Sequence, residues 1–308
     1  MIRFDERVAI VTGAGKGLGR AYAIYLAARG ARVLVNNRRK SDGSDEVIPS
    51  PASSSADEVV QAIRQAGGQA IANYDSVEDP CAGERIVQQA LDAWGRVDVL
   101  INNAGVDQRS TFHKVSVEQF RQIFDINFYG SLYVTHAAYA RMRAAGYGRI
   151  VVSTSVAGLY GLHGLTAYSA SKAALIGFMR TLAMEGKSHN VLANAIAPYA
   201  ATPMTARQGN MPEEFLTTLR PEFVAPAVAL LVSDQKSLNG QVIIAGKGAF
   251  RRAANVEGRG LRYAEPTNAT AEALARDVAQ LLDMEGATEF ADAMAAFQQL
   301  FGQRSEAK

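Results

Sequence analysis

Cysteine is almost absent from this sequence, and histidine is scarce. Cys81 is the only cysteine among 308 residues, and there are four histidines. A single thiol cannot form a disulfide or a cysteine-based metal site within one chain. The histidines form no His-Glu-x-x-His pattern or similar ligand set, so the sequence predicts no metal site. Such cysteine usage is typical of a reducing compartment.

Two further absences exclude other classes of protein. The net charge is only +2 and there is no dense basic run, which argues against a nucleic-acid partner. Apolar runs are short and broken by Gly, Ser or Arg, so no membrane-spanning segment is predicted. Residues 1–7 contain no apolar signal region and the C-terminus carries no recognisable address, and we therefore expect a cytoplasmic protein.

The sequence does contain enough hydrophobic residues, 48% of the total, to bury a substantial core. Near its start, a strand-like run, Val8-Ala-Ile-Val11, leads into a glycine-rich loop at 12–19 and a helical pattern at 20–29. The first N–H groups of a helix are unpaired and its dipole is positive there, so such a corner binds phosphate. The candidate phosphate-binding residues are Gly13, Lys16, Gly17, Leu18 and Gly19.

The end of the second predicted strand, 32–37, lacks an acidic residue. A site specific for NAD normally places Asp or Glu there to bind the ribose hydroxyls. Here Asn37 is followed by Arg38 and Arg39, and Lys16 lies in the glycine loop. Cations without a carboxylate suit the 2′-phosphate of NADP. The pattern favours NADP(H), with NAD(H) and a merely solvated basic loop as the alternatives.

Strand and helix patterns continue to alternate along the chain, with a period of about thirty residues. Further strands are predicted at 69–75, 97–101, 149–153, 191–197 and 240–245. This alternation predicts an α/β protein of Rossmann type: a doubly wound, seven-stranded parallel sheet with helices on both faces. Residues 1–250 would form this NAD(P)-binding domain. Residues 251–308 would be a basic connector and a C-terminal helical extension, with helices at 271–282 and 288–301, that packs on the body or on a partner subunit.

Tyr168-Ser-Ala-Ser-Lys172 is the strongest candidate for chemistry. On a helix, residues four apart project from one face, and an adjacent ammonium should lower the pKa of a phenol toward working pH. The structural alternative is one buried aromatic ring and one lysine stem lying on the surface. Ser155 follows the strand at 149–153. Asn127, inside a helical pattern at 117–142, would be either a structural bridge or part of a proton relay.

In order and spacing, these motifs resemble the short-chain dehydrogenase/reductase family. The matching residues are Thr12-Gly-x-x-x-Gly-x-Gly19, Asn102-Asn-Ala-Gly105, Asn127, Ser155, Tyr168-x-x-x-Lys172, and Pro198 with Thr202. More narrowly, Arg20-Ala-Tyr22, Ala72-Asn-Tyr-Asp-Ser-Val77, Gly158-Leu-Tyr-Gly161 and Ala195-Ile-Ala-Pro198 resemble the (3R)-hydroxyacyl-CoA dehydrogenase domains of peroxisomal multifunctional enzymes type 2, which are also described as 17β-hydroxysteroid dehydrogenases.

The resemblance implies a catalytic set of Asn127, Ser155, Tyr168 and Lys172. Tyr168 would exchange a proton with the substrate oxygen, which Ser155 would stabilise. Lys172 would bind the nicotinamide ribose and lower the pKa of Tyr168, while Asn127 would hold a water. Besides the glycine loop, Tyr168 and Lys172, the implied cofactor-binding residues are Asn37, Arg38, Arg39, Asp75, Ser76, Asn103, Ala104, Gly105, Pro198 and Thr202. Of these, Asn103 would lie at the adenosine and Thr202 at the carboxamide.

Two positions depart from this pattern. Asn37 stands where relatives that use NAD have Asp, which again favours NADP. Tyr199 follows Pro198 where glycine is usual, which reshapes the cleft beside the nicotinamide.

Together these features predict an NADP(H)-dependent oxidoreductase that interconverts a secondary alcohol and a ketone. The candidate small-molecule substrates are a 3-hydroxyacyl-CoA/3-ketoacyl-CoA pair and a hydroxysteroid/ketosteroid pair. The alternatives are a catalytically inactive NADP-sensing regulator and an NAD-dependent dehydrogenase. A serine hydrolase using Ser155 is disfavoured because the Gly-x-Ser-x-Gly elbow is missing. The resemblance also implies a homodimer or homotetramer, formed through the helices that carry Asn127 and Lys172.

Overall fold

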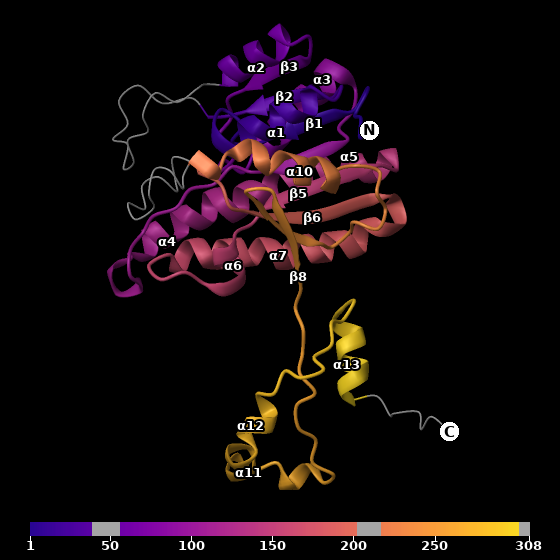
Figure 1. The fold of residues 1–308 in the computed structure, drawn as a ribbon. Coiled ribbons are helices and arrows are strands. Elements are labelled where there is room, and N and C mark those ends of the chain that lie inside the picture. The colour runs from indigo at the N-terminus through magenta and orange to yellow at the C-terminus, as the bar shows by residue number, and fades with distance from the viewer. Residues whose placement is uncertain (39–55, 202–216, 302–308) are drawn as a thin grey trace. The chain divides into compact units, whose positions relative to one another are not determined.

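The computed structural model describes residues 1–38, 56–201 and 217–301. The chain divides into two compact units, Met1–Arg252 and Ala253–Lys308, which are described separately (Figure 1). The first unit contains every residue predicted to bind cofactor or to act in catalysis.

Within the described residues, eight strands form one sheet. They are β1 (Val8–Val11), β2 (Arg32–Asn36), β3 (Gln69–Asn73), β4 (Val99–Asn102), β5 (Gly148–Ser153), β6 (Val191–Pro198), β7 (Val242–Gly246) and β8 (Ala249–Ala253). Their order is β3-β2-β1-β4-β5-β6-β7-β8. Strands β1 to β7 pair in parallel; Val11, for example, lies opposite Val35 of β2 and Ile101 of β4. The strand order reverses beside β1, the place where doubly wound sheets bind ligands at the carboxyl ends of their strands.

The predicted Rossmann-type fold is confirmed, but the predicted count of seven strands is one too few. β8 follows β7 after only two residues, Lys247 and Gly248, whose φ angles are +50° and +75°. Positive φ at both central residues is the signature of a type I′ hairpin turn, which joins antiparallel strands. Arg251 and Arg252, predicted to begin a connector, therefore belong to β8. The strand is mostly exposed, so it lacks the apolar run that marks the others.

Helices cover both faces of the sheet (Figure 1). They are α1 (Gly17–Ala27), α2 (Ala56–Gln65), α3 (Ala82–Trp94), α4 (Val117–Phe124), α5 (Gly130–Ala145), α6 (Val156–Tyr160), α7 (Thr166–Gly186) and α10 (Ala225–Leu231). α1 packs against α2 and α10, whereas α3 packs against α5, and α7 against α4 and α6. None of the helices in the described ranges is long and apolar enough to cross a membrane.

The core lies between the sheet and these two helical layers. Every residue of β1, β4 and β5 is buried, as expected for parallel strands covered on both faces. On the α1 side, Tyr22 and Leu26 pack with Val59 of α2 and Val228 of α10 in one apolar cluster. This rigid interior fixes the carboxyl ends of the strands, where the candidate site residues lie.

The predicted helix at 117–142 is interrupted. α4 and α5 are joined by a π-helical turn, Asp125–Tyr129, and α5 continues to Ala145. A π turn inserts one extra residue into a helix, and such insertions occur frequently at functional sites. Asn127 lies at the centre of this turn and is completely buried.

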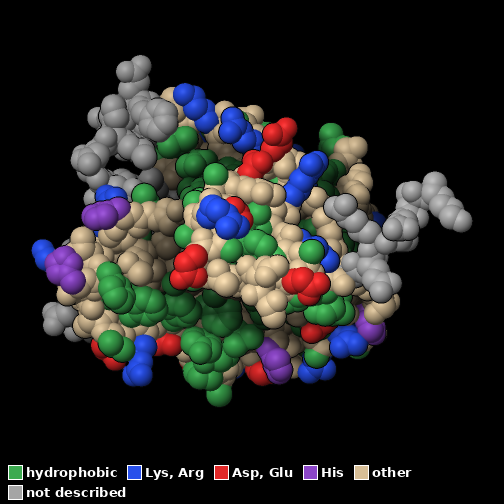
Figure 2. Space-filling model, turned by 90° about the horizontal axis from the view of Figure 1, so that it is seen from below, with side chains coloured by type: hydrophobic (Ala, Val, Ile, Leu, Met, Phe, Trp, Pro, Cys, Tyr) green, Lys and Arg blue, Asp and Glu red, His purple; other side chains and the backbone are tan. Residues whose placement is uncertain are grey.

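The second unit contains the short helices α11 (Ala271–Arg276), α12 (Val278–Leu281) and α13 (Ala293–Phe301), so the predicted helical regions are helical but more broken than expected. Ala273 is the only buried hydrophobic residue within 253–301, whereas Leu282 and Phe301 are 70% and 65% exposed. Figure 2 shows hydrophobic side chains exposed on the surface that it views, without distinguishing the two units. The predicted packing of this extension stays a prediction.

Candidate active site

The glycine loop joins β1 to α1, which begins at Gly17, three residues earlier than predicted. Lys16 precedes the helix in an extended conformation, no side chain caps the helix, and its first turn contains no acidic residue. The first N–H groups of α1 are therefore not capped by the side chain of Lys16, and they fit a phosphate group. Gly13 and Gly17 have positive φ angles, +61° and +54°, which favour glycine.

The loop packs tightly against the segment that follows β4. A Cβ atom on Gly13 would lie 2.8 Å from Cα of Ala104, so no larger residue fits without a backbone shift. The side-chain amide of Asn103 donates to the carbonyl oxygens of Thr12 and Gly13, at 3.1 and 3.2 Å. Asn103 thus supports the glycine loop, and its predicted contact with the adenosine stays a prediction.

The ends of β2 and β3 bring together the other residues predicted at the adenosine. The side chain of Asn37 lies directly against Gly15, where a Cβ atom would be 2.6 Å from Cγ of Asn37. Arg38 lies 3.5 Å from Glu78 through its Nη1 atom, an acidic partner that the sequence did not indicate. Arg39 lies outside the described residues.

Asp75 and Ser76, after β3, already have partners within the protein. Asp75 accepts hydrogen bonds from Arg85 at 2.6 Å and from Asn73 at 2.8 Å. Ser76 donates to Glu78 at 2.9 Å. Both residues lie where a doubly wound sheet binds its ligand, and their contact with a cofactor stays a prediction.

Ser155, Tyr168 and Lys172 come together between β5 and α7. Ser155 precedes α6 as its N-cap in an extended conformation, and it lies close enough to Tyr168 to lower the pKa of the phenol. The ammonium of Lys172 lies 5.7 Å from the centroid of the Tyr168 ring and donates to the carbonyl oxygen of Ser153 at 2.7 Å. The three predicted catalytic groups, distant in sequence, are therefore neighbours.

The buried side chain of Asn127 forms hydrogen bonds next to these three groups, and we call this arrangement the clamp formed by Asn127. Its Oδ1 accepts from the N–H of Val106 at 2.8 Å, and its Nδ2 donates to the carbonyl of Val106 at 3.0 Å and to Oγ of Ser171 at 3.1 Å. A Cβ atom on Gly105 would lie 3.1 Å from Oδ1 of Asn127 and 3.3 Å from Nζ of Lys172. Both donors of the amide are thus bound to protein, and the predicted water contact of Asn127 stays a prediction.

Sequence reasoning missed Ser171. Its hydroxyl accepts from Asn127 and donates to the carbonyl of Tyr168 at 2.8 Å. The available signal was a hydroxyl residue between Tyr168 and Lys172 on a helix, but its partner in the π-helical turn could not be inferred from spacing.

The pKa values of the two central groups are set mainly by burial. The pKa of Tyr168 is raised to about 12, chiefly by burial; Ser155 acts to lower this pKa and the charge of Asp107 to raise it. Burial also lowers the pKa of Lys172 to about 8. Burial thus dominates the pKa of Tyr168 in the protein alone, and the predicted lowering of this pKa by Lys172 stays a prediction.

At the carboxyl end of β6, Pro198 is the last residue of the strand and Tyr199 is 49% exposed. A Cβ atom on Gly246 would lie 2.6 Å from Cβ of Tyr199, so the tyrosine backbone is fixed against β7. Thr202, predicted at the carboxamide, lies outside the described residues.

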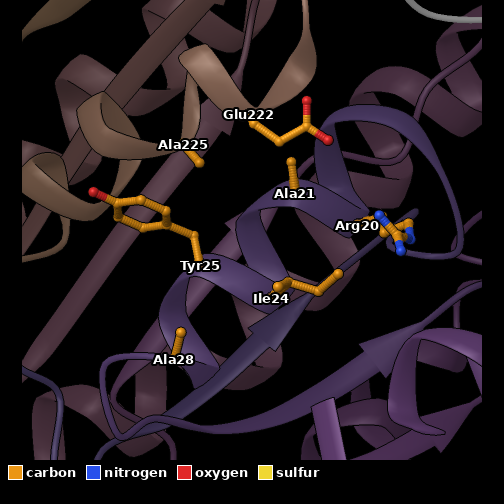
Figure 3. Close-up of a pocket in the computed structure, with 7 residues that line it drawn as sticks. All are labelled: Arg20, Ala21, Ile24, Tyr25, Ala28, Glu222 and Ala225. Atoms are coloured by element: carbon orange, nitrogen blue, oxygen red, sulfur yellow. The ribbon is translucent and has the colours of Figure 1, made fainter. Parts of the chain in front are cut away.

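A separate hollow of about 190 Å³ lies between α1 and α10 (Figure 3). It is lined by Arg20, Ala21, Ile24, Tyr25, Ala28, Glu222 and Ala225. None of these is a predicted site residue, and the hollow is mostly apolar. Within 1–38, 56–201 and 217–301, no group of three His, Cys, Asp or Glu side chains could hold a metal ion.

The sequence of this chain is similar to a known protein family and to several known proteins. A family model described as short chain dehydrogenase matches residues 7–213. A short-chain type dehydrogenase/reductase of Mycobacterium tuberculosis is 42% identical over 286 residues, which cover 92% of this chain and 96% of that protein. Peroxisomal multifunctional enzyme type 2 of Mus musculus is 45% identical over 247 residues, which cover 80% of this chain but only 32% of the mouse protein.

Comparison of the fold with solved structures agrees with the sequence comparison. The structure of full-length peroxisomal multifunctional enzyme type 2 from Drosophila melanogaster matches with a TM-score of 0.81 and 34% identity, covering 97% of this chain and 49% of that one. The resemblance seen in the sequence motifs is thereby confirmed. The chain belongs to the short-chain dehydrogenase/reductase family, and it is an oxidoreductase of the kind that uses a nicotinamide dinucleotide.

Proposed function

We propose that this protein interconverts a secondary alcohol and a ketone with NADP(H), and that its substrate is a 3-hydroxyacyl-CoA/3-ketoacyl-CoA pair or a hydroxysteroid/ketosteroid pair. One observation carries the proposal: Ser155 lies close to the Tyr168 phenol, and the buried ammonium of Lys172 lies beside the same ring. A protein that only sensed a nucleotide would have no need of this proton-transfer group.

When bound, the dinucleotide would supply the hydride for reduction or accept it during oxidation. Tyr168 donates a proton to the carbonyl oxygen during reduction and takes it back during oxidation. Ser155 donates a hydrogen bond to the same oxygen, and comparable donors contribute ~3 kcal/mol by stabilising the developing charge. Because burial raises the pKa of Tyr168 to about 12, the phenol keeps its proton at neutral pH and is ready to donate it.

Lys172 would bind the ribose of the nicotinamide. An ammonium has three donors, and the described residues show one hydrogen bond from it, to the Ser153 carbonyl. Gly105 leaves open the space next to this ammonium, since a Cβ atom there would come within 3.3 Å of Nζ. The clamp formed by Asn127 keeps the segment carrying Gly105 and Val106 in place.

At the other end, the first turn of α1 would bind the pyrophosphate, and Arg38 with Lys16 would bind the 2′-phosphate of NADP(H). Support comes from the absence of an acidic residue or side-chain cap in that turn and from Asn37 in place of a carboxylate. NAD(H) is the competing cofactor. Residues 1–250 would form the cofactor-binding domain, and the helices carrying Asn127 and Lys172 would form a homodimer or homotetramer.

The test is oxidation of NADPH and of NADH by a panel of 3-ketoacyl-CoA esters and ketosteroids. We expect turnover with one of the two substrate classes, faster with NADPH. Tyr168→Phe should lower kcat by at least 10²-fold, the scale of a lost general acid, while NADPH binding followed by calorimetry stays within about twofold of wild type. No turnover of any ketone by the wild type, together with tight NADPH binding, would support a sensing protein instead.

A further inference from the structure

Glu78 stands beside Arg38 at the edge of the proposed adenosine site. Its Oε1 atom lies 3.5 Å from Nη1 of Arg38 and accepts a hydrogen bond from Ser76 at 2.9 Å. Both partners approach the same carboxylate oxygen. The side chains of Arg38 and Glu78 are 61% and 40% exposed, so a soluble ligand can reach them.

The backbone around this pair is fixed. β2 and β3 pair in parallel, with Asn36 opposite Asn73. The buried amide of Asn36 donates to Oδ1 of Asn73 at 2.7 Å and to the carbonyl of Asp75 at 2.9 Å. The N–H of Asn37 donates to the carbonyl of Asn73 at 3.0 Å. The segments carrying Arg38 and Glu78 are therefore joined by several hydrogen bonds, and their proximity follows from the strand register.

We infer that Glu78 sets the discrimination between NADP(H) and NAD(H) by neutralising Arg38. The inference deepens the proposed function, because it rests on Arg38 being the 2′-phosphate ligand. A carboxylate and a phosphate compete for one guanidinium, and the same carboxylate repels the phosphate dianion. A cofactor with a free 2′-hydroxyl carries no phosphate at this position, so Glu78 neither competes with it for Arg38 nor repels it. Glu78 thus supplies, from the turn that follows β3, part of the negative charge that is missing at Asn37.

The inference is tested by calorimetric titration with two probes that lack nicotinamide, adenosine 2′,5′-bisphosphate and adenosine 5′-monophosphate. Glu78→Gln should bind the bisphosphate about three- to fivefold more tightly than wild type, the scale of an exposed ion pair. Its affinity for the monophosphate should stay unchanged. Glu84→Gln, which removes the same charge from an exposed position of α3, is the matched control and should alter neither affinity.

A double-mutant cycle with Arg38→Leu shows whether Glu78 affects bisphosphate binding through Arg38. If Glu78 acts through Arg38, Glu78→Gln has no effect on bisphosphate binding in the Arg38→Leu background. Equal tightening in both backgrounds would overturn the inference, as would an unchanged or weaker affinity of Glu78→Gln in the presence of Arg38. If Arg38→Leu by itself leaves bisphosphate binding unchanged, the proposed 2′-phosphate site fails, and the inference about Glu78 fails with it. NADPH-dependent turnover that nevertheless persists would show that the proposed reaction survives.

Discussion

At the scale of single residues, burial decides the acid–base properties of the site. The Tyr168 phenol and the Lys172 ammonium are each shifted toward their neutral forms, since loss of solvent disfavours charge on either group. The lysine is the more unusual case. An ammonium with a folded-state pKa of about 8 is still mostly protonated at pH 7, so the folded protein carries a buried charge at a cost in stability.

This cost predicts a pH-dependent effect of Lys172→Met. In the wild type, the pKa of Lys172 falls from 10.5 to about 8 on folding, so the penalty is fully present below pH 8 and is relieved as pH rises toward 10.5. The full relief is on the order of 3 kcal/mol. We therefore expect any stability advantage of Lys172→Met over wild type in urea unfolding at pH 7 to shrink, or any deficit to grow, by pH 10.

The comparison between pH values matters more than the difference at one pH, because the variant also loses the hydrogen bond to Ser153. Lys114→Met, at an exposed position, is the control and should track the wild type at both pH values. A constant difference between Lys172→Met and wild type from pH 7 to pH 10 would contradict a lowered pKa at Lys172.

At the scale of elements, strand positions were predicted most accurately for the strands whose residues are all buried. β1, β4 and β5 each contain an uninterrupted run of at least three apolar residues and lie within two residues of their predicted positions. The π-helical turn at Asp125–Tyr129 and the exposed strand β8 were missed. A one-residue insertion barely alters the helical periodicity, and an exposed strand has no apolar run to reveal it.

The π-helical turn is tied to α7 by Ser171, and this link predicts the effect of Ser171→Ala. The hydroxyl is the acceptor of one buried donor of Asn127, and leaving such a donor unsatisfied costs roughly 1–3 kcal/mol. We expect lower stability in urea unfolding and a several-fold lower kcat, because Tyr168 and Gly105 lose their common support.

The same helix contains a matched control. Ser169 has a buried hydroxyl with no hydrogen-bond partner among the described residues, so Ser169→Ala removes a polar group that forms no bond with them and should not reduce stability. If both alanine variants behave alike, Ser171 is an ordinary helix residue and the link to the π-helical turn has no consequence for the site.

At the scale of the whole molecule, the family motifs located the catalytic cluster but not its surroundings. Ser155, Tyr168 and Lys172 were found because their spacing is characteristic. Glu78 and Asp107 were missed, because each meets its partner only after separate strands have been placed side by side. Arg39 and Thr202 lie outside the described residues, so the predictions made for them stay predictions.

The two units differ in how much hydrophobic surface they bury, which predicts how each behaves alone. The first unit contains the buried sheet and both helical layers, whereas Ala273 is the only buried hydrophobic residue within 253–301. A segment of this size without its own core cannot offset the entropy lost on folding. We expect an isolated 253–308 polypeptide to show no cooperative thermal transition by circular dichroism, and a 1–252 chain to unfold cooperatively. A cooperative transition of the isolated segment at several concentrations would contradict this division, whereas loss of cooperativity in 1–252 would show that the first unit depends on the second for its stability.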